Sequence, residues 1–76
     1  MKDILETIIK ALVDDTKAVN INAVEGEKSV VYEVKVAESD MGKVIGKDGK
    51  IARSIRTLIK ALAAKEQKRV TIEFIG

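Results

Sequence analysis

The sequence predicts an α+β domain in which a three-stranded mixed sheet is covered on one face by three helices. Apolar residues recur at helical spacing in two segments and alternate with polar residues in three others. Together with the signals for one short helix, these patterns give the order α-β-β-α-α-β. The length of 76 residues fits one small domain over residues 1–76, with a thin core and marginal stability.

The N-terminal helix is expected over about residues 2–14, where apolar side chains lie on one helical face and polar side chains on the other. Two strands follow at residues 19–23 and 30–36, because apolar and polar residues alternate in both. The polar segment 25–28 between them is short and contains glycine, which favours an antiparallel hairpin.

The pattern changes at residues 38–40, where Ser39 or Asp40 can cap a very short helix that begins near Met41. That helix reaches Gly46, whose missing Cβ suits a left-handed conformation after a helix end. A long helix resumes after Gly49. Its expected apolar stripe consists of Ile51, Ile55, Leu58, Ile59 and Leu62.

Residues 65–68 form a polar connection to a third strand at 70–74. A helical crossover between the second and third strands normally places them parallel in one sheet. The sheet is therefore expected to be mixed, with one antiparallel pair and one parallel pair.

The composition excludes most catalytic chemistry. The chain has no His, Cys or Pro, so imidazole acid–base catalysis, thiolate nucleophiles, disulfides and the usual zinc ligands are absent. Asp14 and Asp15, adjacent at a helix end, are expected to point apart into water. We expect no catalytic residue, no metal and no cofactor. The longest apolar run, Ala61–Ala64, is too short to span a bilayer, and Met1–Asp3 opens no secretory signal, which predicts a cytoplasmic protein.

Charge is distributed unevenly along the chain. Residues 1–40 contain five Lys and nine Asp or Glu, whereas residues 41–76 contain nine Lys or Arg and three Asp or Glu. The C-terminal half is therefore where an anionic partner is expected to bind.

The most informative motif is Gly46-Lys47-Asp48-Gly49, which lies between the aliphatic pair Val44–Ile45 and an amphipathic helix. A phosphate backbone can approach the main chain closely where side chains are absent. The start of the following helix adds a partial positive charge. Phosphate contacts are expected from Lys43, Lys47, Lys50, Arg53 and Arg56.

With this loop and element order, the whole chain resembles a type II KH domain, and its length is similar to that of the stand-alone bacterial KhpA family. In KH domains a Gly-X-X-Gly loop clamps about four nucleotides of a single strand. The resemblance implies single-stranded RNA binding, an RNA-chaperone role, pairing with itself or with a larger Jag-type KH protein, and a role in cell-wall homeostasis and cell-length control. The predicted RNA-binding residues are Lys43, Val44, Ile45, Gly46, Lys47, Asp48, Gly49, Lys50, Ile51, Arg53 and Arg56.

Several of these residues have a second interpretation. Gly46 and Gly49 can simply be helix-end residues, and a bare Gly-X-X-Gly is common. Bases would lie in a groove lined by Val44, Ile45, Ile51 and either Val34 or Val36, yet the same side chains can belong to the core. A carboxylate at Asp48 opposes a phosphate, so we favour a role for Asp48 as the cap of the following helix. Solvated positions are expected for Lys60, Lys65, Lys68 and Arg69.

The far side of the long helix predicts self-association. It collects Arg53, Thr57, Lys60, Ala61 and Ala64, three of which are small enough to let a second helix approach closely. This favours a symmetric homodimer with the two long helices antiparallel. The alternative is that alanine only promotes helix formation on an exposed face.

A second class of function is a protein-interaction module, a dimerisation adaptor with little intrinsic RNA affinity. Other nucleic-acid folds fit less well, because RNA-recognition motifs and oligonucleotide-binding barrels need exposed stacking aromatics. The two aromatics, Tyr32 and Phe74, fall in the alternation assigned to the buried sheet face. The loop also lacks the glycine and lysine spacing of a phosphate-binding NTPase.

Overall fold

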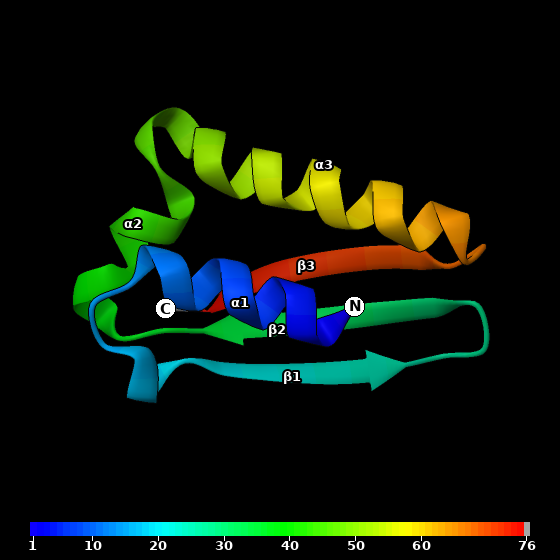
Figure 1. The fold of residues 1–76 in the computed structure, drawn as a ribbon, viewed down its shortest axis with the longest axis horizontal. Coiled ribbons are helices and arrows are strands. Elements are labelled where there is room, and N and C mark those ends of the chain that lie inside the picture. Colours follow the sequence, from blue (N-terminus) through cyan, green and yellow to red (C-terminus); the bar gives the residue numbers. More distant parts are fainter. Residues whose placement is uncertain (76) are drawn as a thin grey trace.

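The computed structural model describes residues 1–75 and confirms the predicted α+β architecture (Figure 1). The helices and strands, in chain order, are α1 (Lys2–Leu12), β1 (Asn20–Glu25), β2 (Ser29–Lys35), α2 (Met41–Ile45), α3 (Lys50–Lys65) and β3 (Arg69–Ile75). Single 3₁₀ turns are η1 (Thr16–Ala18), η2 (Glu38–Asp40) and η3 (Lys47–Gly49). The first helix ends earlier than predicted because Val13 already has an extended backbone.

The three strands form one sheet in the order β1-β2-β3. β1 and β2 are antiparallel, β2 and β3 are parallel, and Tyr32 lies opposite Ala23 on one side and Ile72 on the other. The predicted hairpin is closed by a hydrogen bond from the Gly26 N–H to the Ser29 carbonyl at 2.7 Å. The hairpin and the end of α3 lie at one end of the long axis of the molecule, and α2 and the glycine loop lie at the other (Figure 1).

The core lies between the sheet and the helices. Alternate residues of β2 are buried (Val30, Tyr32 and Val34), as the alternation predicted. The predicted stripe of α3 is partly wrong. The buried residues of α3 are Ala52, Ile55, Ile59 and Ala63. Of the residues predicted for the stripe, Ile51 is 36% exposed and Leu58 is 47% exposed. Ile55, Ile59 and Ala63 belong to the core cluster, and the buried side of α3 therefore includes small residues that hydrophobicity did not select.

No helix within residues 1–75 combines the length and the apolar character that crossing a bilayer requires.

Candidate nucleic-acid interface

The glycine loop has a backbone that few residues can adopt. Gly46 has φ 76° and ψ 174°, a region that is essentially restricted to glycine. Asp48 and Gly49 follow in the left-handed region, with φ values of 56° and 73°. Gly46 follows the end of α2 with a positive φ, as expected for a glycine at this position. Its ψ is extended, however, so the full left-handed conformation that the sequence predicted is not formed.

The two glycines differ in what surrounds them. A Cβ added at Gly46 would lie 2.6 Å from Ile51 Cγ1 and 2.9 Å from Ile51 Cβ, so the first turn of α3 packs directly on this glycine. A Cβ added at Gly49 would meet no atom within 4 Å. Gly46 therefore shapes the loop from inside, whereas the main chain at Gly49 faces open space where a ligand backbone could approach.

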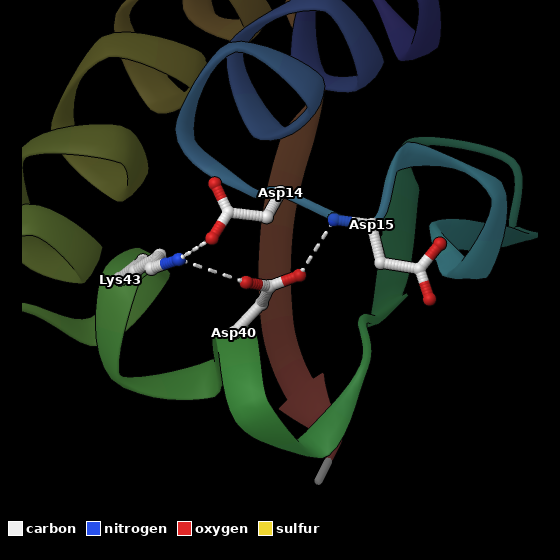
Figure 2. A network of polar contacts seen from close by, with 4 residues as sticks. All are labelled: Asp14, Asp15, Asp40 and Lys43. Atoms are coloured by element: carbon white, nitrogen blue, oxygen red, sulfur yellow. Dashed lines mark hydrogen bonds and ion pairs between the residues drawn. The ribbon is translucent and has the colours of Figure 1, made fainter.

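A polar network anchors α2, the helix that leads into the loop (Figure 2). Asp40 is 1% exposed, and its carboxylate accepts hydrogen bonds from the Asp15 N–H at 3.0 Å and from Lys43 Nζ at 3.2 Å. Lys43 also forms an ion pair with the exposed carboxylate of Asp14. The network thus connects the segment after α1 to the first turn of α2.

The network also changes the ionisation of its members. The Asp15 N–H lowers the pKa of Asp40 most strongly, against the opposing effect of burial, and the Asp14 main chain and Lys43 lower it further. The pKa of Lys43 is raised by its hydrogen bonds to Asp14 and then Asp40. The carboxylate of Asp40 and the ammonium group of Lys43 are therefore both stabilised in their charged forms near neutral pH.

Two predicted helix caps are wrong. Asp40 occupies the N-cap position of α2 but makes no capping hydrogen bond with its side chain, because its carboxylate binds Asp15 and Lys43 instead. The N-cap residue of α3 is Gly49, which has no side chain that could cap the helix. Asp48 is therefore not the cap, and its exposed side chain belongs to a left-handed loop residue, a conformation that Asp tolerates better than most residues.

The predicted cationic residues separate into two groups. Lys47, Lys50 and Arg53 are exposed and, within residues 1–75, belong to no ion pair. Arg53 Nη2 donates to the Asp48 carbonyl at 3.5 Å, which places its charge beside the loop. Lys43 is held by two carboxylates.

Arg56 is directed to the sheet. Its Nε donates to the Ile72 carbonyl at 3.3 Å, and its guanidinium lies 5.3 Å from the Phe74 ring centre. Because the ring is half-buried beneath this cation, Phe74 offers little free surface for stacking a base. Tyr32 is buried, as predicted.

The expected aliphatic groove is smaller than predicted. Val44 and Val34 are fully buried and Val36 nearly so, so these three residues belong to the core and cannot contact a base. Ile45 is half-buried and Ile51 is partly exposed beside the loop. These two side chains are the aliphatic surface that remains next to Gly46.

The predicted pairing face of α3 is exposed in the single chain. All five of its residues are exposed, namely Arg53, Thr57, Lys60, Ala61 and Ala64. Leu58 lies beside Ala61 on the helix surface and adds an exposed apolar side chain that the sequence had assigned to the core.

The positioning role of Asp40 was missed by the sequence prediction, which treated the residue only as a cap. Its spacing of three residues from Lys43 was a usable signal for a local ion pair. The contact with Asp15 was not readable from the sequence, because it joins residues 25 positions apart. Within residues 1–75 no group of three or more acidic side chains is arranged to hold a metal ion.

The element order, the mixed sheet and the glycine loop between two helices are those of a type II KH domain. The family model described as KhpA/KhpB, KH domain matches residues 2–74, and the chain belongs to this family. Proteins named RNA-binding protein KhpA from Clostridium acetobutylicum and Caldanaerobacter subterraneus subsp. tengcongensis are 59% and 56% identical to it over 75 residues. Each match covers 99% of this chain and 100% of the relative. No solved structure matches the chain.

Proposed function

We propose that the protein binds single-stranded RNA, with the phosphate backbone passing over the loop at residues 46–49. The observation that carries this proposal is the open main chain at Gly49, which is followed directly by the start of α3. It is flanked by Lys47 and Lys50, which are exposed and belong to no ion pair among residues 1–75. The family and the printed names of the relatives support the same ligand.

The site divides into contact residues and positioning residues. Lys47, Lys50 and Arg53 supply the phosphate contacts, and Ile45 and Ile51 supply an aliphatic surface for a base. Lys43 acts indirectly, since its charge is shared with Asp14 and Asp40 and its role is to fix α2. With about three or four phosphates neutralised, log affinity should fall with log salt at a slope of about −2 to −3.

The test is the substitution Lys47→Asp, which places two carboxylates side by side in the loop. Since Lys47 is exposed, the free energy of unfolding should change by less than about 0.5 kcal/mol, while RNA affinity falls at least tenfold. A matched control is Lys17→Asp in η1, which makes the same charge change away from the loop (Figure 1). Unchanged affinity in a folded Lys47→Asp protein would reject this site.

We further propose that the protein acts in the cytoplasm, in the cellular role that the family resemblance implies. We include an RNA-chaperone activity, and a role in cell-wall homeostasis and cell-length control, in the proposal. Strand-annealing assays and complementation of a deletion strain with the Lys47→Asp protein test these roles, and full complementation would separate them from the loop.

A homodimer, or a heterodimer with a Jag-type KH protein, is the second part of the proposal. The supporting observation is the exposed face of α3, where Ala61, Thr57 and Ala64 leave room for a second helix and Leu58 adds apolar area. Ala61→Arg should abolish the dimer without unfolding the chain, as measured by sedimentation. A monomer at high micromolar concentration in the unmodified protein would reject the homodimer. If pairing persists and RNA binding is absent, the protein is a dimerisation adaptor.

A further inference from the structure

Two adjoining open cavities lie at the other end of α3 from the glycine loop. One is about 520 Å³ and the other about 430 Å³, and Lys68 and Arg69 line both. Lys28 extends the lining of the first cavity and Lys60 that of the second. The remaining lining residues are uncharged, so the two cavities present four cations and no carboxylate.

The backbone beneath these cations is fixed. Gln67 has a left-handed φ of 57°, and the N–H groups of Gln67 and Lys68 donate to the carbonyls of Ala64 and Ala63, both at 3.0 Å. This double hydrogen bond is the Schellman termination of a helix. The Arg69 N–H then donates to the Lys28 carbonyl at 2.9 Å, which joins the turn to the β1–β2 hairpin.

The cations at this end are not neutralised by the nearby carboxylates. Within residues 1–75, none of Lys28, Lys60, Lys68 and Arg69 belongs to an ion pair. Glu25 and Glu66 are close enough to Tyr32 to add, after burial, to the rise in the pKa of its phenol. Both carboxylates belong to exposed residues and, within residues 1–75, neither forms an ion pair with these cations.

A track of cations connects the two ends of α3. Arg53, Arg56 and Lys60 recur at intervals of three and four residues, which places them on one side of the helix. Arg56 reaches Ile72 of β3, and Lys60 shares a cavity with Val70 of the same strand, so this side of α3 is the side next to β3. The track occupies the middle of α3, whose 16 residues separate the glycine loop from the two cavities by about 24 Å.

We propose that Lys28, Lys68 and Arg69, together with Lys60 at the edge shared with the pairing face of α3, form a second phosphate-binding site, which binds the same RNA strand after it leaves the glycine loop along α3 and β3. This inference rests on the proposed RNA binding and extends its footprint. At roughly 3.4 Å per stacked nucleotide, about 24 Å corresponds to about seven nucleotides. An acidic protein surface fits less well, because the cavities lack the exposed apolar or aromatic anchor that protein interfaces centre on.

The experiment compares oligouridylates of about four and about ten nucleotides. For the unmodified protein, we expect the longer strand to bind about tenfold more tightly or better. The variant Lys68→Glu/Arg69→Glu should lose this gain and leave the affinity for the short strand unchanged. Its salt slope for the longer strand should become shallower by about 1.4, because two phosphate contacts are lost.

Controls separate this inference from the proposed function. Lys17→Glu/Lys35→Glu makes the same charge change at exposed positions outside the track and should retain the gain with length. If the first variant does not fold, Lys28→Gln/Lys68→Gln tests the same site without charge reversal and outside the pairing face of α3. If the folded variants still bind the longer strand more tightly than the short one, the second site alone is overturned.

Loss of all RNA binding in Lys47→Asp supports the glycine loop as the primary site. If the unmodified protein binds polyglutamate but neither oligouridylate, both RNA proposals fail.

Discussion

The two ends of α3 are built in different ways. At its start, the shape of the loop depends on side-chain packing and on a buried carboxylate, since Ile51 fills the space above Gly46 and Asp40 anchors α2. At its end, the turn depends on main-chain hydrogen bonds, and the cationic side chains are not needed for it. The first end should therefore be sensitive to changes of shape and the second to changes of charge.

The same contrast appears in the use of lysine. Near the loop, Lys43 is held by Asp14 and Asp40 and contributes to the structure. At the other end, Lys68 belongs to no ion pair within residues 1–75. A count of positive charges near a motif thus overestimates the number that are available to a ligand.

The largest expected effect is that of Gly46→Ala. The new Cβ would overlap Ile51 Cβ, which cannot rotate away, and alanine is strained at a φ of 76°. Backbone strain and overpacking together should reduce the free energy of unfolding by about 2–4 kcal/mol. Thermal or urea unfolding followed by circular dichroism measures this loss.

Gly42→Ala is the matched control for that substitution. Gly42 lies in α2, and a Cβ there meets nothing within 4 Å. Because alanine favours helix, this variant should be equally stable or more stable by up to about 1 kcal/mol. Equal stability of the two variants would show that the loop is not shaped by packing on Gly46.

Asp40→Asn should have the next largest effect. An amide of the same shape cannot accept hydrogen bonds from both the Asp15 N–H and Lys43 with its two polar atoms, because one of those atoms is a donor. The melting temperature should fall by about 5–10 °C near pH 7. Asp14→Asn, which changes an exposed carboxylate in the same network, should lower it much less.

The effect of Asp40→Asn depends on pH with a defined sign. Since the pKa of Asp40 is lowered by folding, its stabilisation is fully present above the ordinary pKa near 3.8 and is lost as the pH falls through the lower value of the folded state. The stability difference between the unmodified protein and the variant should therefore be constant from about pH 5 to pH 8 and shrink as the pH falls below about 4. A difference that grows in acid would contradict the assigned network.

Periodicity was sufficient to predict the element order and the sheet, because both depend on local patterns and on one handedness rule. It was not sufficient to choose which side of α3 faces the sheet. The sequence favoured Leu58, whereas the structure buries Ala52 and Ala63. The choice depends on how closely the helix can approach the strands, which hydrophobicity alone does not encode.

The residues of the candidate site were predictable as a motif, but their individual roles were not. The Gly-X-X-Gly spacing correctly located the turn between α2 and α3. The roles of Asp40 and Lys43 depend on a contact with the segment after α1, and the cation cluster at Lys68 and Arg69 depends on the proximity of the hairpin. Such pairings are consequences of the fold and not of local sequence.

Gly49→Ala should destabilise the protein less than Gly46→Ala does, and it tests the open side of the loop. A Cβ there meets no protein atom, so only the left-handed strain of about 1–2 kcal/mol remains. If RNA passes over this glycine, the methyl group occupies ligand space, and affinity should fall more than the stability loss can explain.

Gly49→Asn separates occlusion from strain in that experiment. Asparagine tolerates the left-handed region better than alanine, so this variant should be more stable than Gly49→Ala while projecting a larger side chain toward the ligand. If occlusion dominates, RNA affinity decreases from glycine to alanine to asparagine, although the stability of asparagine lies between those of the other two. Affinities that follow stability instead would mean that the RNA backbone does not approach Gly49. Fluorescence titrations well below the melting temperature of each variant distinguish the two orders.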